Sequence, residues 1–176
     1  MEASDERLAM AAAAGDDAAF AALLARHYDR VFRLAFRLTG RAAEAEDLTQ
    51  DVALALPAKL RGFRGDARFT TWLYRVVVNA ASDRRRRSAS RSRAALGWGE
   101  VERARRSEAT EAAAAQTWLE DAMSTLPEAL RDTVALVLDD LTHREAAEVL
   151  GVSEGTVSWR ISEAKKHLKA LKEAEA

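Results

Sequence analysis

Apolar residues recur at spacings of three and four positions along the first third of the chain, a period that predicts amphipathic helices. In residues 17–38 the recurring positions are Phe20, Leu23, Leu24, Val31, Leu34, Ala35 and Leu38. Gly40 follows as a helix stop. The sequence therefore predicts one long helix here, preceded by a short alanine-rich one.

A second apolar face predicts a helix over residues 43–56. Leu48, Val52 and Leu56 share this face, and Pro57 is expected to end or kink the helix, because proline lacks a backbone N–H. The following segment, KLRGFRGDARF, has two glycines within four residues and is predicted to be a loop.

The stretch TTWLYRVVVNAASDRRRR, residues 70–87, is predicted to be a helix with two apolar sides. One side carries Trp72, Leu73, Val76, Val77 and Ala80, and the other carries Tyr74, Val78 and Ala81. A narrow polar stripe runs between them through Arg75, Asn79, Ser82 and Arg86. Aromatic rings beside arginine and asparagine can bind single-stranded nucleic acid. From periodicity alone both interpretations stand, and packing of Trp72 and Tyr74 in a core is the favoured one for the aromatic residues.

Residues 88–112 contain Ser, Gly and Arg without a sustained apolar period and are predicted to be a flexible linker. Beyond it, helices are expected over 113–123 and after Pro127, which suits the start of a helix. The predicted fold class is therefore all-α, with two small helical domains over residues 1–87 and 113–176.

The second domain carries the pattern of a helix-turn-helix. Thr142 followed by Glu145 matches a capping box, Gly151 permits a tight turn, and Ser153 can cap the next helix. The apolar stripe of that helix is Val157, Ile161, Ala164, Leu168 and Leu171. Such a unit places its second helix in the major groove of DNA. An ordinary helical hairpin with a lysine-rich exposed face is the alternative.

Composition narrows the possible functions. The chain has no cysteine, its three histidines are far apart in sequence, and it shows no metal-ligand spacing or glycine-rich phosphate loop. We therefore expect no enzyme activity, no metal and no cofactor. The acidic first residues do not resemble a signal peptide, and no apolar run approaches the roughly 18 residues of a membrane span. A cytoplasmic protein is expected.

Charge is unevenly distributed, although the net charge is only −1. Residues 61–106 hold 13 basic and 4 acidic residues, a local charge of +9 between two acidic flanks. Such a segment attracts polyanions such as nucleic acids. A solvated arginine-rich linker would give the same charge pattern.

Several motifs, in order, resemble those of bacterial extracytoplasmic-function sigma factors of the sigma-70 family. These are AEDLTQDV, FRGDARFTTWLYRVVVNAASD, TLPEALRDTVAL and EAAEVLGVSEGTV, and the resemblance covers about residues 17–172. It implies a dissociable RNA polymerase subunit that recognises and opens promoter DNA. The implied partners are core RNA polymerase, promoter DNA and an anti-sigma factor.

The resemblance also implies three sets of site residues. Core polymerase would be bound by Asp47, Gln50 and Asp51. The opened minus-ten element would be bound by Phe63, Arg64, Gly65, Asp66, Arg68, Phe69, Arg75, Asn79 and Arg86, with Arg84 to Arg87 facing phosphates. The minus-thirty-five element would be bound by Ser153, Thr156, Ser158, Trp159, Arg160 and Lys165.

The recognition helix departs from the family pattern, because Ser158 and Glu163 occupy positions that are usually basic, and Leu136 stands where arginine is frequent. Two other functions remain possible from the residues alone. One is a free-standing helix-turn-helix regulator that binds duplex DNA, and the other is a general binder of RNA or single strands. Neither would need the motifs of the first domain.

Overall fold

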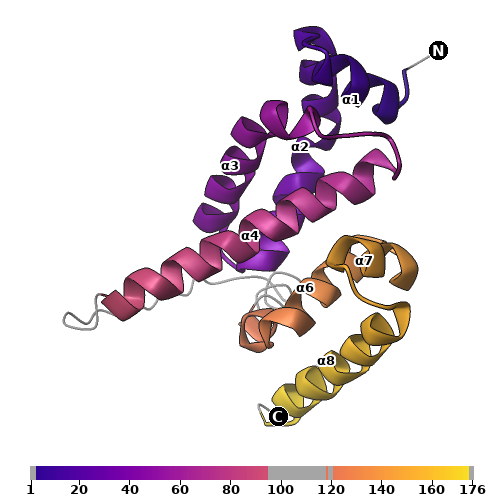
Figure 1. Cartoon of the computed structure of the whole chain (residues 1–176). Coiled ribbons are helices and arrows are strands. Elements are labelled where there is room, and N and C mark those ends of the chain that lie inside the picture. The colour runs from indigo at the N-terminus through magenta and orange to yellow at the C-terminus, as the bar shows by residue number, and fades with distance from the viewer. Residues whose placement is uncertain (1–2, 95–117, 119–120, 175–176) are drawn as a thin grey trace.

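A computed structural model describes residues 3–94, 118 and 121–174 (Figure 1), and within these residues all regular secondary structure is helical. The helices are α1 (Asp5–Ala13), α2 (Asp17–Thr39), α3 (Ala42–Leu60), α4 (Phe69–Ala94), α6 (Glu128–Val137), α7 (His143–Leu150) and α8 (Glu154–Ala174). The predicted all-α class is confirmed.

The first part of the chain is built around α2, which packs against α1, α3 and α4. Its ends follow the sequence signals, since the Asp16 side chain accepts a hydrogen bond from the Ala19 N–H and Gly40 takes a left-handed conformation after the last turn. Leu23, Leu34 and Leu38 are almost fully buried. The predicted apolar stripe of α2 is therefore the core-facing side.

The third helix does not end at Pro57, which was one of the two outcomes expected there, because α3 continues to Leu60. Proline lacks a backbone N–H, so Pro57 loses one hydrogen bond to the carbonyl four residues earlier. The N–H groups of the residues after Pro57 can still donate to carbonyls of the preceding turn. Leu56 and Leu60 are 3% and 0% exposed, so burial of this last turn stabilises it.

The fourth helix is longer than the sequence indicates, starting at Phe69 and continuing to Ala94 instead of ending at residue 87. Residues 88–94 of the predicted linker are thus helical, and most of the remaining linker lies outside the described residues. The helix predicted over 113–123 is also only partly described, with residues 121–125 helical.

The second part is formed by α6, α7 and α8, which pack on one another. It also lies against the first part, because α6 contacts α2 and α7 contacts α4. Buried residues of both parts join one apolar cluster, which includes Val77 of α4, Leu136 of α6 and Val157 of α8. Both apolar sides of α4 are buried as a result, since Tyr74 and Val78 on one side are 3% and 7% exposed and Leu73 on the other is 1% exposed.

Candidate nucleic-acid interface

The loop between α3 and α4 is anchored at both ends by an aromatic cluster. The ring centroids of Phe63 and Phe69 are 5.8 Å apart, and the Trp72 ring lies 5.4 Å from Phe63 and 5.8 Å from Phe69. Phe69 is completely buried and Phe63 is 8% exposed. In this arrangement the two phenylalanines support the loop, so neither ring is free to stack on a base.

Between these anchors, residues 64–68 are exposed. Gly65 has a φ of 75°, a left-handed conformation that favours glycine at this turn. Arg64 Nε lies 3.2 Å from Asp66 Oδ2, and both side chains are largely exposed. The loop therefore presents charged groups to solvent from a fixed base.

The predicted polar stripe of α4 is on the surface, with Arg75 and Asn79 exposed. Part of this stripe is covered by the second domain. Arg75 Nη2 donates to the backbone oxygen of Glu148 in α7 at 2.5 Å, and Arg68 Nη1 lies 3.4 Å from Glu145 Oε1. The same groups that could hold phosphates thus contact the protein's own helix-turn-helix.

The acidic residues of α3 are paired with α4. Arg84 reaches Asp51 Oδ2 at 2.5 Å and Asp47 Oδ2 at 3.3 Å. Both carboxylates remain half-exposed or more, Gln50 is exposed beside them, and the neighbouring Leu54 is 82% exposed. The predicted polymerase-binding residues therefore form one accessible face, with an arginine already bound to it.

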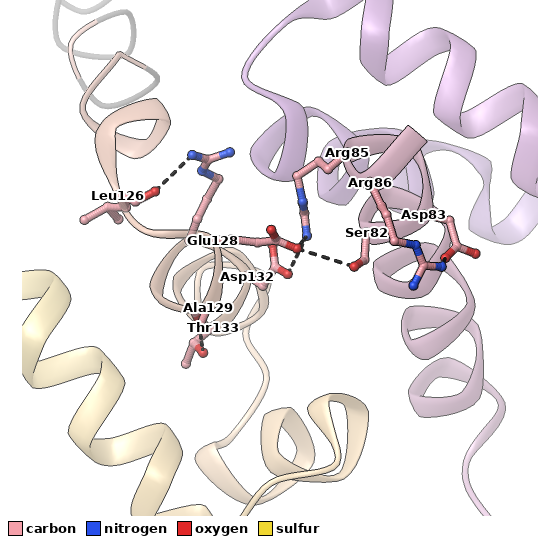
Figure 2. A network of polar contacts seen from close by, with 10 residues as sticks. Ser82, Asp83, Arg85, Arg86, Leu126, Glu128, Ala129, Asp132 and Thr133 are labelled. Carbon is pink, nitrogen blue, oxygen red and sulfur yellow. Dashed lines mark hydrogen bonds and ion pairs between the residues drawn. The ribbon is translucent and has the colours of Figure 1, made fainter. Parts of the chain in front are cut away.

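Arg85 points toward α6 instead (Figure 2). Its Nη2 atom lies 2.7 Å from Glu128 Oε1 and 2.8 Å from Asp132 Oδ2, and Ser82 donates to Glu128 at 3.4 Å. Burial raises the pKa of Asp132 even though the Arg85 charge acts to lower it. Among the described residues, Arg85 Nε and Nη1 and Asp132 Oδ1 are buried without hydrogen-bond partners. The pair is thus largely removed from water and incompletely satisfied.

The last two arginines of the run pair within α4. Arg86 binds Asp83 Oδ1 at 2.5 Å, and Arg87 Nε donates to the Asp83 backbone oxygen at 3.3 Å. The four arginines therefore do not form one shared surface in this arrangement, and the expectation that Arg84 to Arg87 face phosphates stays a prediction. Successive residues of a helix project about 100° apart, so adjacent arginines meet different partners.

A second polar contact joins the two parts of the chain. Arg37 Nη1 of α2 lies 2.6 Å from Asp139 Oδ1, and the Tyr74 hydroxyl of α4 donates to Asp139 Oδ2. Burial, together with the hydrogen bond and charge of Asp139, strongly raises the pKa of Tyr74. Asp139 and Asp132 therefore attach the second part to α2 and α4, and neither is among the site residues predicted from the sequence.

The helix-turn-helix is confirmed as a local structure. Thr142 and Glu145 form the predicted capping box, Gly151 takes a φ of 66°, and the Ser153 hydroxyl accepts from the Thr156 N–H at 3.1 Å. The apolar stripe of α8 faces inward, with Val157 and Ala164 buried.

The predicted contact residues lie near the start of α8 and along its outer side. Trp159 is 60% exposed, Lys165 is exposed and Arg160 is half-buried. Ser158 already contacts His143 Nδ1 at 2.9 Å, and Ser153 is occupied by the helix cap. Trp159, Arg160 and Lys165 are therefore the predicted residues most available for contacts.

The part of the chain that the structure describes holds neither a candidate metal site nor a candidate membrane span. No group of three or more His, Cys, Asp or Glu side chains there could hold a metal ion. The described helices also include none that is long and apolar enough to cross a membrane.

Comparison with known proteins identifies both parts of the chain. Residues 23–91 match the family described as Sigma-70 region 2, and residues 116–168 match Sigma-70, region 4. The chain is 38% identical over 172 residues to the ECF RNA polymerase sigma factor SigM of Mycobacterium tuberculosis, covering 97% of this chain and 85% of that one. It is 32% identical to SigE of Mycolicibacterium smegmatis, covering 96% and 69%.

The fold has a counterpart among solved structures. CnrH, solved in complex with the cytosolic domain of CnrY, superposes with a TM-score of 0.73 at 28% identity, covering 98% of this chain and 99% of that one. A free-standing helix-turn-helix regulator would leave the region 2 match unexplained. The chain therefore belongs to the extracytoplasmic-function sigma factors, non-catalytic subunits that bind core RNA polymerase and promoter DNA and direct promoter-specific initiation of transcription.

Proposed function

We propose that this sigma factor divides its work among three surfaces. The acidic face of α3, with Asp47, Gln50 and Asp51, binds core polymerase. The exposed loop 64–68 and the Arg75–Asn79 stripe of α4 bind the opened minus-ten element. The outer side of α8 binds the minus-thirty-five element. The observation that carries the proposal is the exposed loop held between two buried phenylalanines, directly followed by the exposed Asn79 stripe.

The chemistry of strand opening suits this arrangement. Extruding a base from a duplex costs a few kcal/mol, which a fixed site can offset with hydrogen bonds to the base edge. The Asn79 amide both donates and accepts hydrogen bonds, and it is exposed beside Arg75. Arg64 and Arg68 lie in the loop at positions from which they can meet phosphates.

The protein cannot bind the two promoter elements at the same time in the arrangement of Figure 1. Elements at minus ten and minus thirty-five are separated by about 25 base pairs, or about 85 Å of B-form DNA at 3.4 Å per step. A compact chain of this length has a radius of gyration of about 16 Å. The α6–α8 unit must therefore separate from α4, which also exposes Arg75 fully.

The same proposal covers domain limits, location and regulation. The first domain ends with α4 and the second begins before α6, joined by the segment between them. The protein acts in the cytoplasm, where bacterial RNA polymerase transcribes DNA. Because CnrH was solved in complex with the cytosolic domain of CnrY, we include an anti-sigma factor as a partner of this chain.

The test is transcription by purified core polymerase with this protein, on a genomic template library. Asn79→Ala should reduce promoter opening, measured by permanganate reactivity, more than it reduces core affinity. The double variant Asp47→Ala, Asp51→Ala should reduce core affinity more. Equal effects of both variants on both assays would contradict the division of surfaces.

Arg84→Ala is the control for the acidic face. Removing Asp47 and Asp51 also deprives Arg84 of its partners, so a defect caused only by that loss would appear in Arg84→Ala too. If the carboxylates bind polymerase themselves, Arg84→Ala should retain core binding or strengthen it, because the carboxylates are then free.

A further inference from the structure

Helix α1 lies outside the matched region 2 segment, yet it contacts the start of α4. Glu6 Oε1 accepts a hydrogen bond from the Phe69 N–H at 3.2 Å, across 63 positions of sequence. The first N–H groups of a helix have no partner within the helix. Arg68 stands in the capping position, since its backbone oxygen accepts from Trp72, but an arginine side chain can only donate. Glu6 therefore provides an acceptor for the first of these free N–H groups, at a helix start where the Arg68 side chain can accept none.

The carboxylate of Asp5, the residue before Glu6, contacts His27, and the His27 ring packs against the Phe69 ring. Asp5 Oδ2 lies 2.8 Å from His27 Nε2, and Asp5 Oδ1 lies 3.0 Å from Arg26 Nη1. The His27 ring is 6% exposed, and its centroid is 5.1 Å from that of Phe69. Two consecutive residues of α1 thus hold Phe69, one through its backbone and one through a histidine against its ring.

Phe69 in turn determines where the loop 64–68 ends. Its ring is fully buried against Phe63 and Trp72, so a shift of Phe69 would move the aromatic cluster that anchors both ends of the loop. A binding loop that is already held in its bound shape loses less conformational entropy when it takes up a ligand. The contacts from α1 therefore reach the residue at which the exposed loop ends.

We propose that Glu6, supported by Asp5 and His27, is a positioning residue for the minus-ten loop, so that α1 is part of the strand-opening apparatus. The inference rests on the proposed function of loop 64–68. It assigns α1 no direct contact with DNA. Its effect is on how well the separated non-template strand is bound once polymerase and promoter have met.

The test compares three substitutions of Glu6 in holoenzyme. Glu6→Gln keeps an oxygen at the same reach, Glu6→Asp keeps the charge but is one methylene shorter, and Glu6→Ala removes the acceptor. Each holoenzyme is bound to a fork-junction fragment of a promoter that the wild type opens, with 2-aminopurine at the extruded base of the non-template strand. Fluorescence reports extrusion, and a separate titration reports core affinity.

We expect Glu6→Ala and Glu6→Asp to weaken capture of the 2-aminopurine strand by about fivefold, as loss of one hydrogen bond to a backbone N–H implies. Glu6→Gln should stay within about twofold of wild type, and core affinity should change little in all three. Capture by Glu6→Asp or Glu6→Ala equal to wild type would overturn the proposal. So would equal losses in core affinity and capture, which would indicate only general damage.

Two comparisons complete the design. Asp17→Ala removes another exposed carboxylate, from the first turn of α2, and should behave as wild type. If Glu6→Ala is unfolded at the assay temperature by circular dichroism, the Gln and Asp variants decide the matter.

The proposed function can fail separately. If wild type gives no 2-aminopurine signal, or Asn79→Ala leaves that signal unchanged, the loop and stripe do not bind the strand. If Asn79→Ala lowers the signal and Glu6→Ala does not, only the role of α1 is refuted.

Discussion

The contact between Arg85 and α6 provides a measurable link between the two parts of the chain. The Arg85 side chain is 23% exposed and Asp132 is 10% exposed, whereas the second partner, Glu128, is 53% exposed. Removing one member of a buried ion pair costs about 3–5 kcal/mol. Because Glu128 is solvated and Arg85 is only partly buried, we expect Arg85→Ala to weaken the closed arrangement by about 2 kcal/mol. The ratio of open to closed molecules should rise about thirtyfold.

Fluorescence energy transfer measures this ratio directly. The chain has no cysteine, so Glu46→Cys and Lys169→Cys, at exposed positions of α3 and α8, provide unique labelling sites. Arg86→Ala is the matched control, because Arg86 is the next residue and its pair with Asp83 is exposed and lies within the same helix. Loss of the Arg86–Asp83 pair should change the free-energy difference between the open and closed arrangements by at most about 0.5 kcal/mol. Equal open-to-closed ratios for Arg85→Ala and Arg86→Ala would refute the reasoning.

Acid should partly reverse the effect of Arg85→Ala. Burial raises the pKa of Asp132 in the closed state, and loss of the Arg85 charge raises it further. Because the pKa of Asp132 is higher in the closed state than in the open state, protonation of Asp132 favours the closed state. This stabilisation is complete below the open-state pKa, and it is lost as the pH rises through the closed-state pKa. The transfer efficiency of Arg85→Ala should therefore increase as the pH is lowered, and Arg85→Ala with Asp132→Asn should show a weaker pH response.

Further predictions concern stability and the recognition helix. Phe69→Ala should lower the free energy of unfolding in a urea titration by about 3–5 kcal/mol, because the ring is fully buried. Thr142→Ala should cost about 1 kcal/mol through loss of the capping box. Hydrogen bonds from Thr142 lower the pKa of Glu145 in the folded protein. Their contribution to the free energy of unfolding is therefore present above the pKa of Glu145 in the unfolded chain, and it is lost as the pH falls through the lower folded-state pKa. The difference in stability between Thr142→Ala and wild type should shrink in acid. Trp159→Ala should reduce binding of the α8 surface to minus-thirty-five DNA, by gel shift of holoenzyme, without changing core affinity.

Local patterns in the sequence predicted most of the secondary structure. The apolar stripes of α2 and α8, the capping box at Thr142 and the turn at Gly151 each depend on residues within a few positions of one another, and the structure confirms all of them. The continuation of α3 past Pro57 was not predictable from the local pattern, because the burial of Leu60, a tertiary contact, stabilises the last turn.

Contacts between distant residues were not predictable in this way. Glu6 and Phe69 are 63 positions apart, and Arg85 and Asp132 are 47 apart. The spacing of apolar residues along the sequence gives no information about pairs so far apart. A carboxylate that caps a distant helix therefore has the same local sequence pattern as a carboxylate exposed to solvent. The buried state of Asp132 and Asp139 likewise depends on how α6 meets α2 and α4. The site residues implied by the family resemblance stay predictions until the assays above are made.

The run of four arginines at the end of α4 has a consequence for mutagenesis. Arg84 contacts α3, Arg85 contacts α6, and Arg86 and Arg87 contact Asp83 of their own helix. A run of identical charges is commonly treated as one redundant patch, in which any member can replace another. Here alanine substitution of each arginine in turn should give a different phenotype. A variant with all four arginines replaced should show a combination of defects that no single substitution gives.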